Sequence, residues 1–328
     1  MTIYDGVRKG MLAGIVAAAA LAAVPALSQD YPNRPISMIV PWAAGGGTDI
    51  LVRALTPAME QAIGQPINVV NRTGGSGLVG HTAMATSAPD GYNIGTINVD
   101  LSQLVCQGLT DLSADKFTQI ALLNVEHSAV IVKADSPFST LAEAIDAIKS
   151  SPPGTYTASG SGAGSIYHLA WVGMMVAAGI EADRVTWVPS QGGGPSLQDV
   201  SSGAVDFVTP PLSDSKALLD AGNIRALATM SPERNQVFPN VPTVKEAIDV
   251  EWSLATWRMI GAPLGLPDDV KAKVLEAVQV AYDSETFQNF MKERGFSFSW
   301  LGPDEARAFH VAQDAAICDV MKVAGMVQ

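Results

Sequence analysis

The sequence predicts an α/β protein with two domains, because strand-like and helix-like segments alternate along most of the chain. Apolar, β-branched runs such as 36–40 and 67–70 are typical of strands, and the amphipathic stretch 48–63 between them has a helical period. Such alternation is typical of largely parallel sheets covered by helices. The 328 residues, 48% of them apolar, are enough for two ordinary domains with cores of their own.

The predicted elements follow one another in a regular order. We expect strands at 36–40, 67–70, 92–97, 129–132, 155–158, 184–188, 205–208, 224–228 and 254–260. We expect helices at 48–63, after Gly77, at 141–149 and 165–178, around 196–202 and through much of the C-terminal region. The chain is expected to cross between the domains near 129–132 and near 254–260. Domain 1 would comprise residues 29–128 plus 252–328, and domain 2 residues 129–251.

The N-terminal segment predicts export of the chain. Arg8 and Lys9 precede an uncharged, alanine-rich run over 11–27, which ends in small residues up to Ser28. This is the pattern of a signal peptide that covers residues 1–28 and is cleaved near Ser28. A membrane anchor is the alternative, but the run is shorter than the roughly 20 residues that a spanning helix needs. No cysteine stands at the cleavage point, so a lipid anchor is not indicated.

Composition and reactive side chains exclude several classes of function. The 32 acidic and 20 basic side chains give a net charge of −12, which disfavours a nucleic-acid partner. The four histidines have no carboxylate or thiol at ligand spacing, and common hydrolase, phosphate-loop and zinc-protease motifs are absent from the sequence. We therefore expect no metal, no cofactor and no enzymatic activity. Cys106 and Cys318 could pair in an oxidising compartment or stay free and buried, and the sequence leaves both open.

Three glycine-rich turns carry the strongest functional signal. They are Pro41 to Asp49, Ser159 to Ser165 and Ser190 to Gly194, and each lies between a predicted strand and a predicted helix. The first amides of a helix lack partners within it, and glycine lets an anion approach closely, so each turn is a candidate anion site. The alternative is a tight connection that binds nothing. Thr48 or Asp49 is expected to cap the first helix, which gives Asp49 a structural role.

A fourth glycine segment has the form of a dinucleotide fingerprint. Gly75 to Gly80 matches G-x-G-x-x-G, and Asp100 stands 20 residues after the last glycine. The segment follows the second predicted strand rather than the first, and an exported protein has little access to nicotinamide cofactors. We therefore interpret these glycines as helix-packing positions.

Several segments, some of them already described, resemble a known family when they are taken in order. They are Tyr31 to Pro35, Pro41 to Asp49, Val70 to Arg72, Gly74 to Gly80, Pro89 to Tyr92, Ser159 to Ser165 with His168, Gln191 to Pro195, Gly203 to Asp206 and Pro239 to Glu246. With this order and spacing over essentially the whole mature chain, the sequence resembles the tripartite tricarboxylate transporter substrate-binding proteins, also called the Bug family.

The resemblance implies a fold, a location and a function. The fold would be α/β, of the two-domain periplasmic-binding-protein (Venus flytrap) kind, type II-like, with the ligand in the interdomain cleft. The protein would be a periplasmic solute-binding protein that captures a small carboxylate-containing acid and passes it to integral membrane transporter subunits; we expect a monomer. The implied ligand-binding residues are Trp42, Ala43, Ala44, Gly45, Gly46, Thr48, Asp49, Ser159, Ser161, Gly162, Ala163, Gly164, Ser165, His168, Gln191, Gly192 and Gly193.

Two charged residues bear on ligand specificity. Arg258 stands where the family more often has an apolar or aromatic residue. It is a further candidate ligand contact, to a second carboxylate, although a surface position at the hinge is the favoured interpretation. Asp100 near the cleft would disfavour a densely anionic ligand unless it faces away or pairs with Arg258. The identity of the ligand cannot be read from these residues.

Two other functions stay open at the level of sequence. An exported hydrolase could use Ser161 or Ser165 together with His168. A sensory binding subunit would report its ligand to a membrane receptor, and the sequence does not separate that role from transport.

Overall fold

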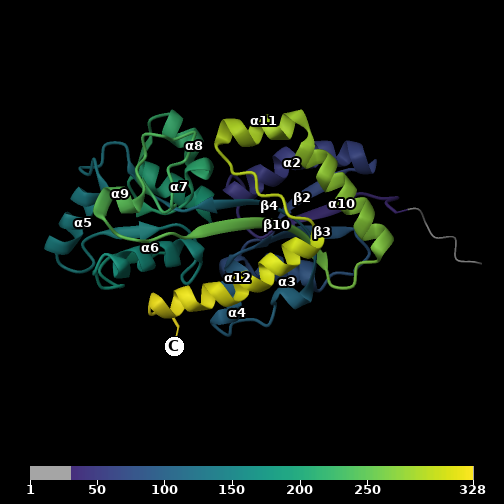
Figure 1. Cartoon of the computed structure of the whole chain (residues 1–328), viewed down its shortest axis with the longest axis horizontal. Helices are drawn as coiled ribbons and strands as arrows, with labels where there is room; N and C mark the ends of the chain where they lie inside the picture. Colours follow the sequence, from purple (N-terminus) through teal and green to yellow (C-terminus); the bar gives the residue numbers. More distant parts are fainter. Residues whose placement is uncertain (1–30, 328) are drawn as a thin grey trace, which may run out of the picture. The chain divides into compact units, whose positions relative to one another are not determined.

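The computed structural model describes residues 31–327, and the signal peptide predicted over 1–28 lies outside them. From Arg34 onward the chain forms one unit built on two five-stranded sheets (Figure 1).

The first sheet is mixed and has helices on both faces. Its strands, in spatial order, are β2 (Ile67–Asn71), β1 (Ile36–Val40), β3 (Asn93–Asn98), β10 (Ala255–Pro263) and β4 (Phe117–His127). The first three run parallel, and β10 is antiparallel to both of its neighbours. Its helices are α2 (Gly47–Ile63), α3 (Leu78–Ala85), α4 (Asp100–Cys106), α10 (Asp268–Asp283), α11 (Glu285–Arg294) and α12 (Pro303–Val323). Helix α10 packs on α2, and α12 packs on α4, on the opposite side of the strands (Figure 1).

The second sheet repeats this arrangement with shorter strands. Its spatial order is β7 (Thr186–Val188), β6 (Thr157–Ser159), β8 (Phe207–Val208), β5 (Ala129–Lys133) and β9 (Ile224–Thr229). Strands β7, β6 and β8 are parallel, and β5 is antiparallel to β8 and β9. Its helices are α5 (Leu141–Ser150), α6 (Ile166–Ala177), α7 (Gly193–Ser202), α8 (Leu212–Asp220) and α9 (Val244–Ile248).

The chain passes between the two sheets at two adjacent places. Strand β4 ends at His127 in the first sheet, and β5 begins at Ala129 in the second. The returning segment lies beside this crossing: Ser128 N–H donates to Leu254 O, and Leu254 N–H donates to Met230 O. Backbone hydrogen bonds therefore hold the two crossings together. The domain boundaries at residues 128/129 and 251/252 stay predictions.

The prediction of largely parallel sheets is wrong, since each sheet has as many antiparallel as parallel strand pairs. The reason is the double crossing: β5 and β10 arrive from the other sheet and enter against the direction of the local strands. Strand β4 was also not predicted. It is buried along most of its length, yet Gln119, Asn124 and Glu126 interrupt its apolar run, so the strand pattern is obscured.

Two local predictions about the glycine segments can be compared with the structure. Helix α2 begins at Gly47 with Gly46 as its cap residue, so the prediction that Thr48 or Asp49 caps this helix is wrong. The Asp49 carboxylate instead accepts from Gly45 N–H at 2.9 Å, which keeps its role structural. A β-carbon at Gly80 would lie 2.6 Å from Pro41 Cα, as the helix-packing interpretation of Gly75 to Gly80 predicts.

Cys106 and Cys318 form a disulfide, with Cα atoms 5.4 Å apart, that joins α4 to α12. This resolves the choice that the sequence left open.

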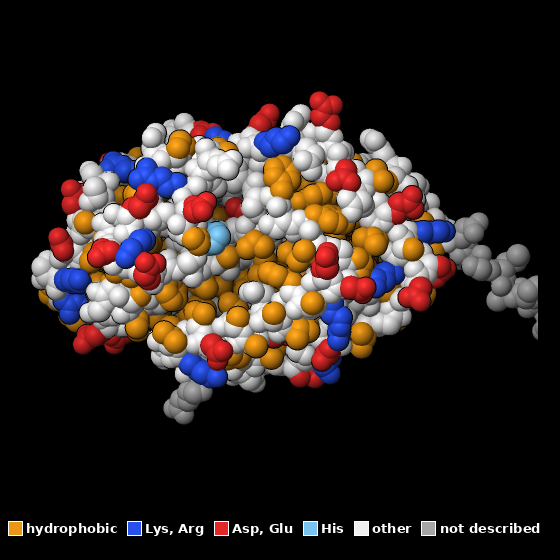
Figure 2. Space-filling model, viewed as in Figure 1, with side chains coloured by type: hydrophobic (Ala, Val, Ile, Leu, Met, Phe, Trp, Pro, Cys, Tyr) orange, Lys and Arg blue, Asp and Glu red, His pale blue; other side chains and the backbone are white. Residues whose placement is uncertain are grey.

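Acidic and basic side chains are interspersed over the face in Figure 2, so the net negative charge is not gathered into one patch there. Within residues 31–327, no helix is both long and apolar enough to cross a membrane, and no group of three metal-ligating side chains is found.

Candidate functional site

The three glycine turns predicted from the sequence come together, although they follow strands of different sheets. The turn before α2 contacts the turn before α7 directly: Ala43 N–H donates to Gln191 O at 3.4 Å, and a β-carbon at Gly192 would lie 3.3 Å from the Trp42 ring. A β-carbon at Gly194 would lie 2.9 Å from Gly46 N. Glycine at these positions therefore allows backbone from the two sheets to touch.

A small cavity lies where the turns meet. Its lining residues come from both sheets and are Trp42, Gly46, Gly47, Thr48, Asn98, Asp100, Ser161, Tyr167, Gly192, Gly193, Thr256 and Arg258. Its volume is about 20 Å³, which is room for about one water molecule. A larger molecule could enter only if the turns moved apart.

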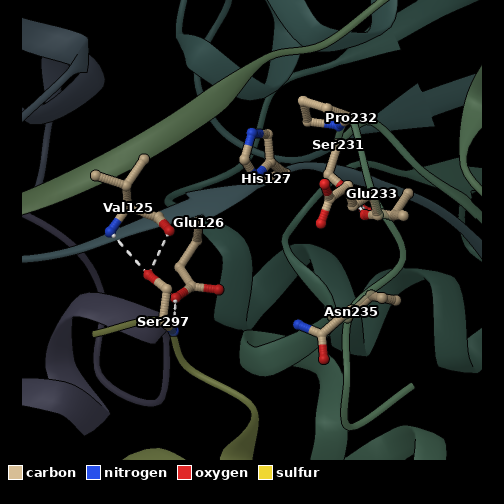
Figure 3. Close-up of a pocket in the computed structure, with 10 residues that line it drawn as sticks. Val125, Glu126, His127, Ser231, Pro232, Glu233, Asn235 and Ser297 are labelled. Atoms are coloured by element: carbon tan, nitrogen blue, oxygen red, sulfur yellow. Dashed lines mark hydrogen bonds between the residues drawn. The ribbon is translucent and has the colours of Figure 1, made fainter. Parts of the chain in front are cut away.

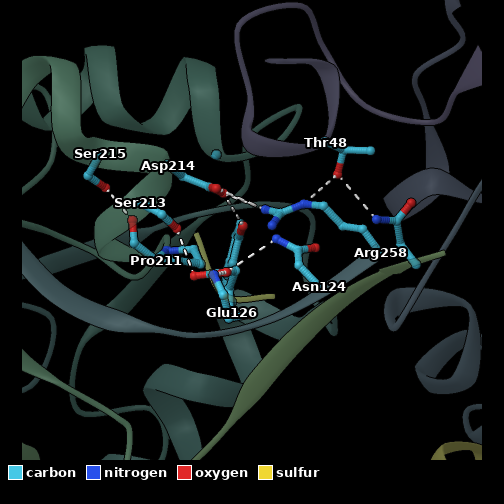
Figure 4. A network of polar contacts seen from close by, with 12 residues as sticks. Thr48, Asn124, Glu126, Pro211, Ser213, Asp214, Ser215 and Arg258 are labelled. Carbon is cyan, nitrogen blue, oxygen red and sulfur yellow. Dashed lines mark hydrogen bonds and ion pairs between the residues drawn. The ribbon is translucent and has the colours of Figure 1, made fainter. Parts of the chain in front are cut away.

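The start of α2 is covered by a carboxylate of the protein itself. Asp214, on α8, lies so close to Gly47 that a β-carbon there would be 2.0 Å from Asp214 Oδ1. Arg258 Nη2 donates to both oxygens of this carboxylate at 2.9 and 2.8 Å, and Tyr167 O–H donates to Oδ2 at 3.3 Å (Figure 4). Burial raises the pKa of the Asp214 carboxyl, and the Arg258 charge opposes that shift. A negative group at this helix N-terminus is favoured by the helix dipole.

Arg258 is buried, with 1% of its surface exposed, so the favoured interpretation as a surface hinge residue is wrong. It lies on β10, which runs between β3 and β4 in the first sheet and is buried from its second residue onward. Its Nε donates to Thr48 Oγ1 at 3.2 Å, an oxygen that also accepts from Asn98 Nδ2. Its Nη1 has no hydrogen-bond partner within residues 31–327. Arg258 therefore lines the cavity with a guanidinium that has one buried nitrogen without a partner in these residues.

The start of α6 also holds an internal carboxyl group. Asp100, at the first residue of α4, accepts from Ile166 N–H through Oδ1 at 2.9 Å. Burial raises the pKa of the Asp100 carboxyl to about 7. Asp100 is directed to this helix terminus, and the side-chain partners of Arg258 are Thr48 and Asp214, so the alternative in which Asp100 pairs with Arg258 is not what the structure has.

A third buried carboxyl group, Glu126, joins this polar cluster from β4. It accepts from Ser213 Oγ at 2.9 Å, from Ser297 N–H at 2.6 Å and from Asn124 Nδ2 at 3.2 Å (Figure 4). Burial raises the pKa of the Glu126 carboxyl to about 7, and the charge of Arg258 lowers it.

Glu126 also lines a second, larger cavity of about 360 Å³ near the crossings between the sheets (Figure 3). His127 lines it from the end of β4, and Glu233 and Asn235 line it from the segment between β9 and α9. Burial lowers the pKa of His127 below its ordinary range.

The predicted site residues divide into two groups. Those that line the small cavity are Trp42, Gly46, Thr48, Ser161, Gly192, Gly193 and Arg258. Those that do not line it are Ala43, Ala44, Gly45, Asp49, Ser159, Gly162, Ala163, Gly164, Ser165, His168 and Gln191. Gly162 and Gln191 line another cavity of about 220 Å³, and Trp42 lines both cavities.

Residues that sequence reasoning missed complete the cavity wall. They are Asn98, Tyr167 and Thr256, together with Asp214 behind them, while Gly47 belongs to the predicted turn from Pro41 to Asp49. The position of Asp214 shortly after β8 could have suggested it, since ligands in α/β folds lie beyond the carboxyl ends of strands.

His168 supports its own turn rather than a serine hydroxyl. Its Nδ1 accepts from Gly164 N–H at 3.0 Å, and its ring packs against Trp187. Burial lowers its pKa to about 4, so it is neutral at pH 7. The hydroxyls of Ser161 and Ser165 bond to each other. His168 therefore does not form with Ser161 or Ser165 the hydrogen-bonded pair that the hydrolase alternative requires.

Comparison with known proteins agrees with this architecture. The family described as "Tripartite tricarboxylate transporter family receptor" matches residues 51–317. The periplasmic binding protein BugD has a TM-score of 0.82 at 26% identity, covering 90% of this chain and 99% of that one.

Two solved structures contain ligands. MatC (Rpa3494) from Rhodopseudomonas palustris, with bound malate, has a TM-score of 0.77 at 27% identity over 91% of this chain and 100% of that one. R. palustris Rpa4515 with adipate has a TM-score of 0.83 at 26% identity over 90% and 99%. With the fold shared over nine-tenths of its length, this chain is a solute-binding receptor, not an enzyme, and belongs to the tripartite tricarboxylate transporter receptor family.

Proposed function

We propose that this protein captures a small organic acid in the periplasm and delivers it to the integral membrane subunits of a tripartite tricarboxylate-type transporter. The observation that carries the proposal is the meeting of the α2 and α7 N-termini, from two different sheets, at one cavity that the buried Arg258 also lines. Malate and adipate in two related structures support the ligand class, and the periplasmic BugD supports the location.

The cavity offers donors to an acid. Helix α7 begins at Gly193, and the first amides of a helix have no partners within it. The Thr48 hydroxyl oxygen already accepts from Arg258 Nε and Asn98 Nδ2, so its own proton is left to donate. Together with Arg258 Nη1, these groups would hold a carboxylate and a second polar group.

Opening about the two crossings would admit the ligand. The crossings are joined by backbone hydrogen bonds at Ser128, Met230 and Leu254, and the contacts on the cavity side include the Arg258–Asp214 ion pair and the hydrogen bond from Ile166 to Asp100. Residues 29–128 plus 252–328 would then move as one domain and residues 129–251 as the other. The protein would act as a monomer. When its two domains close on the ligand, they would present a surface that the membrane subunits distinguish from the surface of the open form.

Titration calorimetry on the mature chain from Gln29, against a panel of small mono-, di- and tricarboxylic acids, tests the proposal. We expect at least one acid to bind with a Kd near the micromolar range, about −8 kcal/mol. Thr48→Val, which removes the donating hydroxyl from the cavity, should weaken that binding at least tenfold. Thr82→Val on the exposed surface of α3 is the matched control and should leave it unchanged. Absence of binding across the panel, or conversion of a bound acid to products, would overturn the proposal.

A further inference from the structure

The three glycine turns do not offer three equal anion sites. At α2 the Asp214 carboxylate lies over Gly47, and at α6 the Asp100 carboxyl accepts from Ile166 N–H. At α7, no side-chain carboxyl group in the described part of the chain is hydrogen-bonded to Gly192 or Gly193, and both line the cavity. The α7 terminus is therefore the one of the three where a ligand carboxylate meets backbone amides without displacing a carboxyl group of the protein.

The guanidinium of Arg258 is largely used by the protein. Nη2 contacts both oxygens of Asp214, and Nε donates to Thr48. Only Nη1 is left, and it is buried and has no partner in residues 31–327. A second ligand carboxylate could not form the two-point contact that arginine and carboxylate prefer, whereas a single neutral oxygen would satisfy Nη1.

The charges around Arg258 also disfavour a second ligand carboxylate. Asp214, Asp100 and Glu126 are all buried near this one guanidinium, and its charge is already matched by Asp214. A second ligand carboxylate would lie in a desolvated space beside carboxyl groups, with no unmatched cation among the cavity residues to offset it.

We propose that Asp214 is a specificity-determining residue: by pairing with Arg258, it selects acids with one carboxylate and a neutral acceptor, an amide or hydroxyl, at the other end. Dicarboxylic acids would bind more weakly. The inference rests on the proposed capture of organic acids in this cavity, and it sets this chain apart from the relatives solved with malate and adipate.

Matched acids test the selection by titration calorimetry at pH 7.5. Succinamate is compared with succinate, and adipamate with adipate, so that each pair differs only in whether one end is an amide or a carboxylate. We expect the better-fitting amide acid to bind the unaltered protein at least tenfold more tightly than its diacid. Asp214→Asn keeps the shape but leaves the charge of Arg258 unmatched, and it should reverse the preference in favour of the diacid.

Two further variants keep the test decisive. Asp220→Asn alters an exposed carboxylate on the same helix, and the amide-to-diacid ratio should stay as in the unaltered protein. Asp214→Asn combined with Arg258→Gln has no buried unmatched charge, so it covers the case in which Asp214→Asn alone does not fold, and its ratio should fall to within threefold of one. Tighter binding of the diacid by the unaltered protein, or an unchanged ratio in the Asp214 variants, overturns the role of Asp214. No binding of either class overturns the proposed function itself.

Discussion

The turns before α2 and α6 are built alike, and each helix receives a carboxyl group from elsewhere in the chain. The difference lies in the partner of that group. Asp214 at α2 contacts the Arg258 guanidinium at 2.8 Å, whereas Asp100 at α6 contacts a backbone amide. Similar glycine turns therefore hold an ion pair in one case and, in the other, a carboxyl group that titrates near neutral pH. What a glycine turn binds depends on the side chain that the rest of the fold brings to it.

Breaking the ion pair at α2 is expected to have the largest effect. Arg258→Met leaves the buried Asp214 carboxylate without its cation, and we expect the free energy of unfolding to fall by about 3–5 kcal/mol. Urea denaturation followed by circular dichroism measures this loss. The double variant Arg258→Met with Asp214→Leu removes both charges and should recover most of the stability. If the double variant is as unstable as the single one, packing rather than charge explains the loss.

Removing the disulfide should destabilise the protein beside the α6 turn without changing any residue of that turn. The bond ties α4, whose first residue is Asp100, to α12. Cys106→Ser with Cys318→Ser should lower the free energy of unfolding by about 2–5 kcal/mol, because the open chain gains conformational entropy. Reduction of the unaltered protein should give the same loss in urea denaturation. Equal stability of the oxidised and reduced protein would contradict this prediction.

Filling the space over α2 should have a moderate effect. In Gly47→Ala the new β-carbon meets the Asp214 carboxylate at 2.0 Å, so the carboxylate must leave its position at the helix. We expect a loss of about 1–3 kcal/mol by urea denaturation. Gly162→Ala is the matched control at the α6 turn, where the β-carbon meets the rotatable Ser76 hydroxyl, and it should cost less than about 1 kcal/mol. A larger loss for Gly162→Ala would reverse the comparison.

The smallest expected effect is a pH dependence that belongs to Asp100. Its pKa is about 7 in the folded protein against an ordinary 3.8, so between these values the native state keeps a proton that the unfolded chain releases. Its contribution to stability is therefore greatest at low pH and falls as the pH rises through 7. The free energy of unfolding of Asp100→Asn, taken relative to that of the unaltered protein, should therefore rise by about 1–2 kcal/mol between pH 6 and 8.

Because this change is a difference between the free energies of unfolding of two proteins, the contributions of titrating groups that both proteins contain cancel. His81 and His168, with pKa values of about 4, act in the opposite direction on acidification, and Glu126 acts in the same direction as Asp100. Urea denaturation at each pH measures both proteins. A constant difference across this range would show that Asp100 does not titrate there.

The sequence predicted what depends on local pattern. The first strand, the long helix after it and the three glycine turns follow from apolar period and from glycine between strand and helix. Tyr167 could not be assigned to the cavity because nothing local marks it, and the pairing of Arg258 with Asp214 could not be predicted because 44 positions of chain separate them. The prediction of strand direction was wrong because direction is also not a local property: it depends on where β5 and β10 enter their sheets.

The disulfide has a consequence for how the molecule is made and broken down. Residues 107–317 form a covalently closed ring that contains every strand of the second sheet, because Cys106 precedes them and Cys318 follows them. A single peptide-bond cleavage within the ring leaves one molecule held together by the bridge. The ring also cannot close until Cys318, 212 positions after Cys106, has been synthesised.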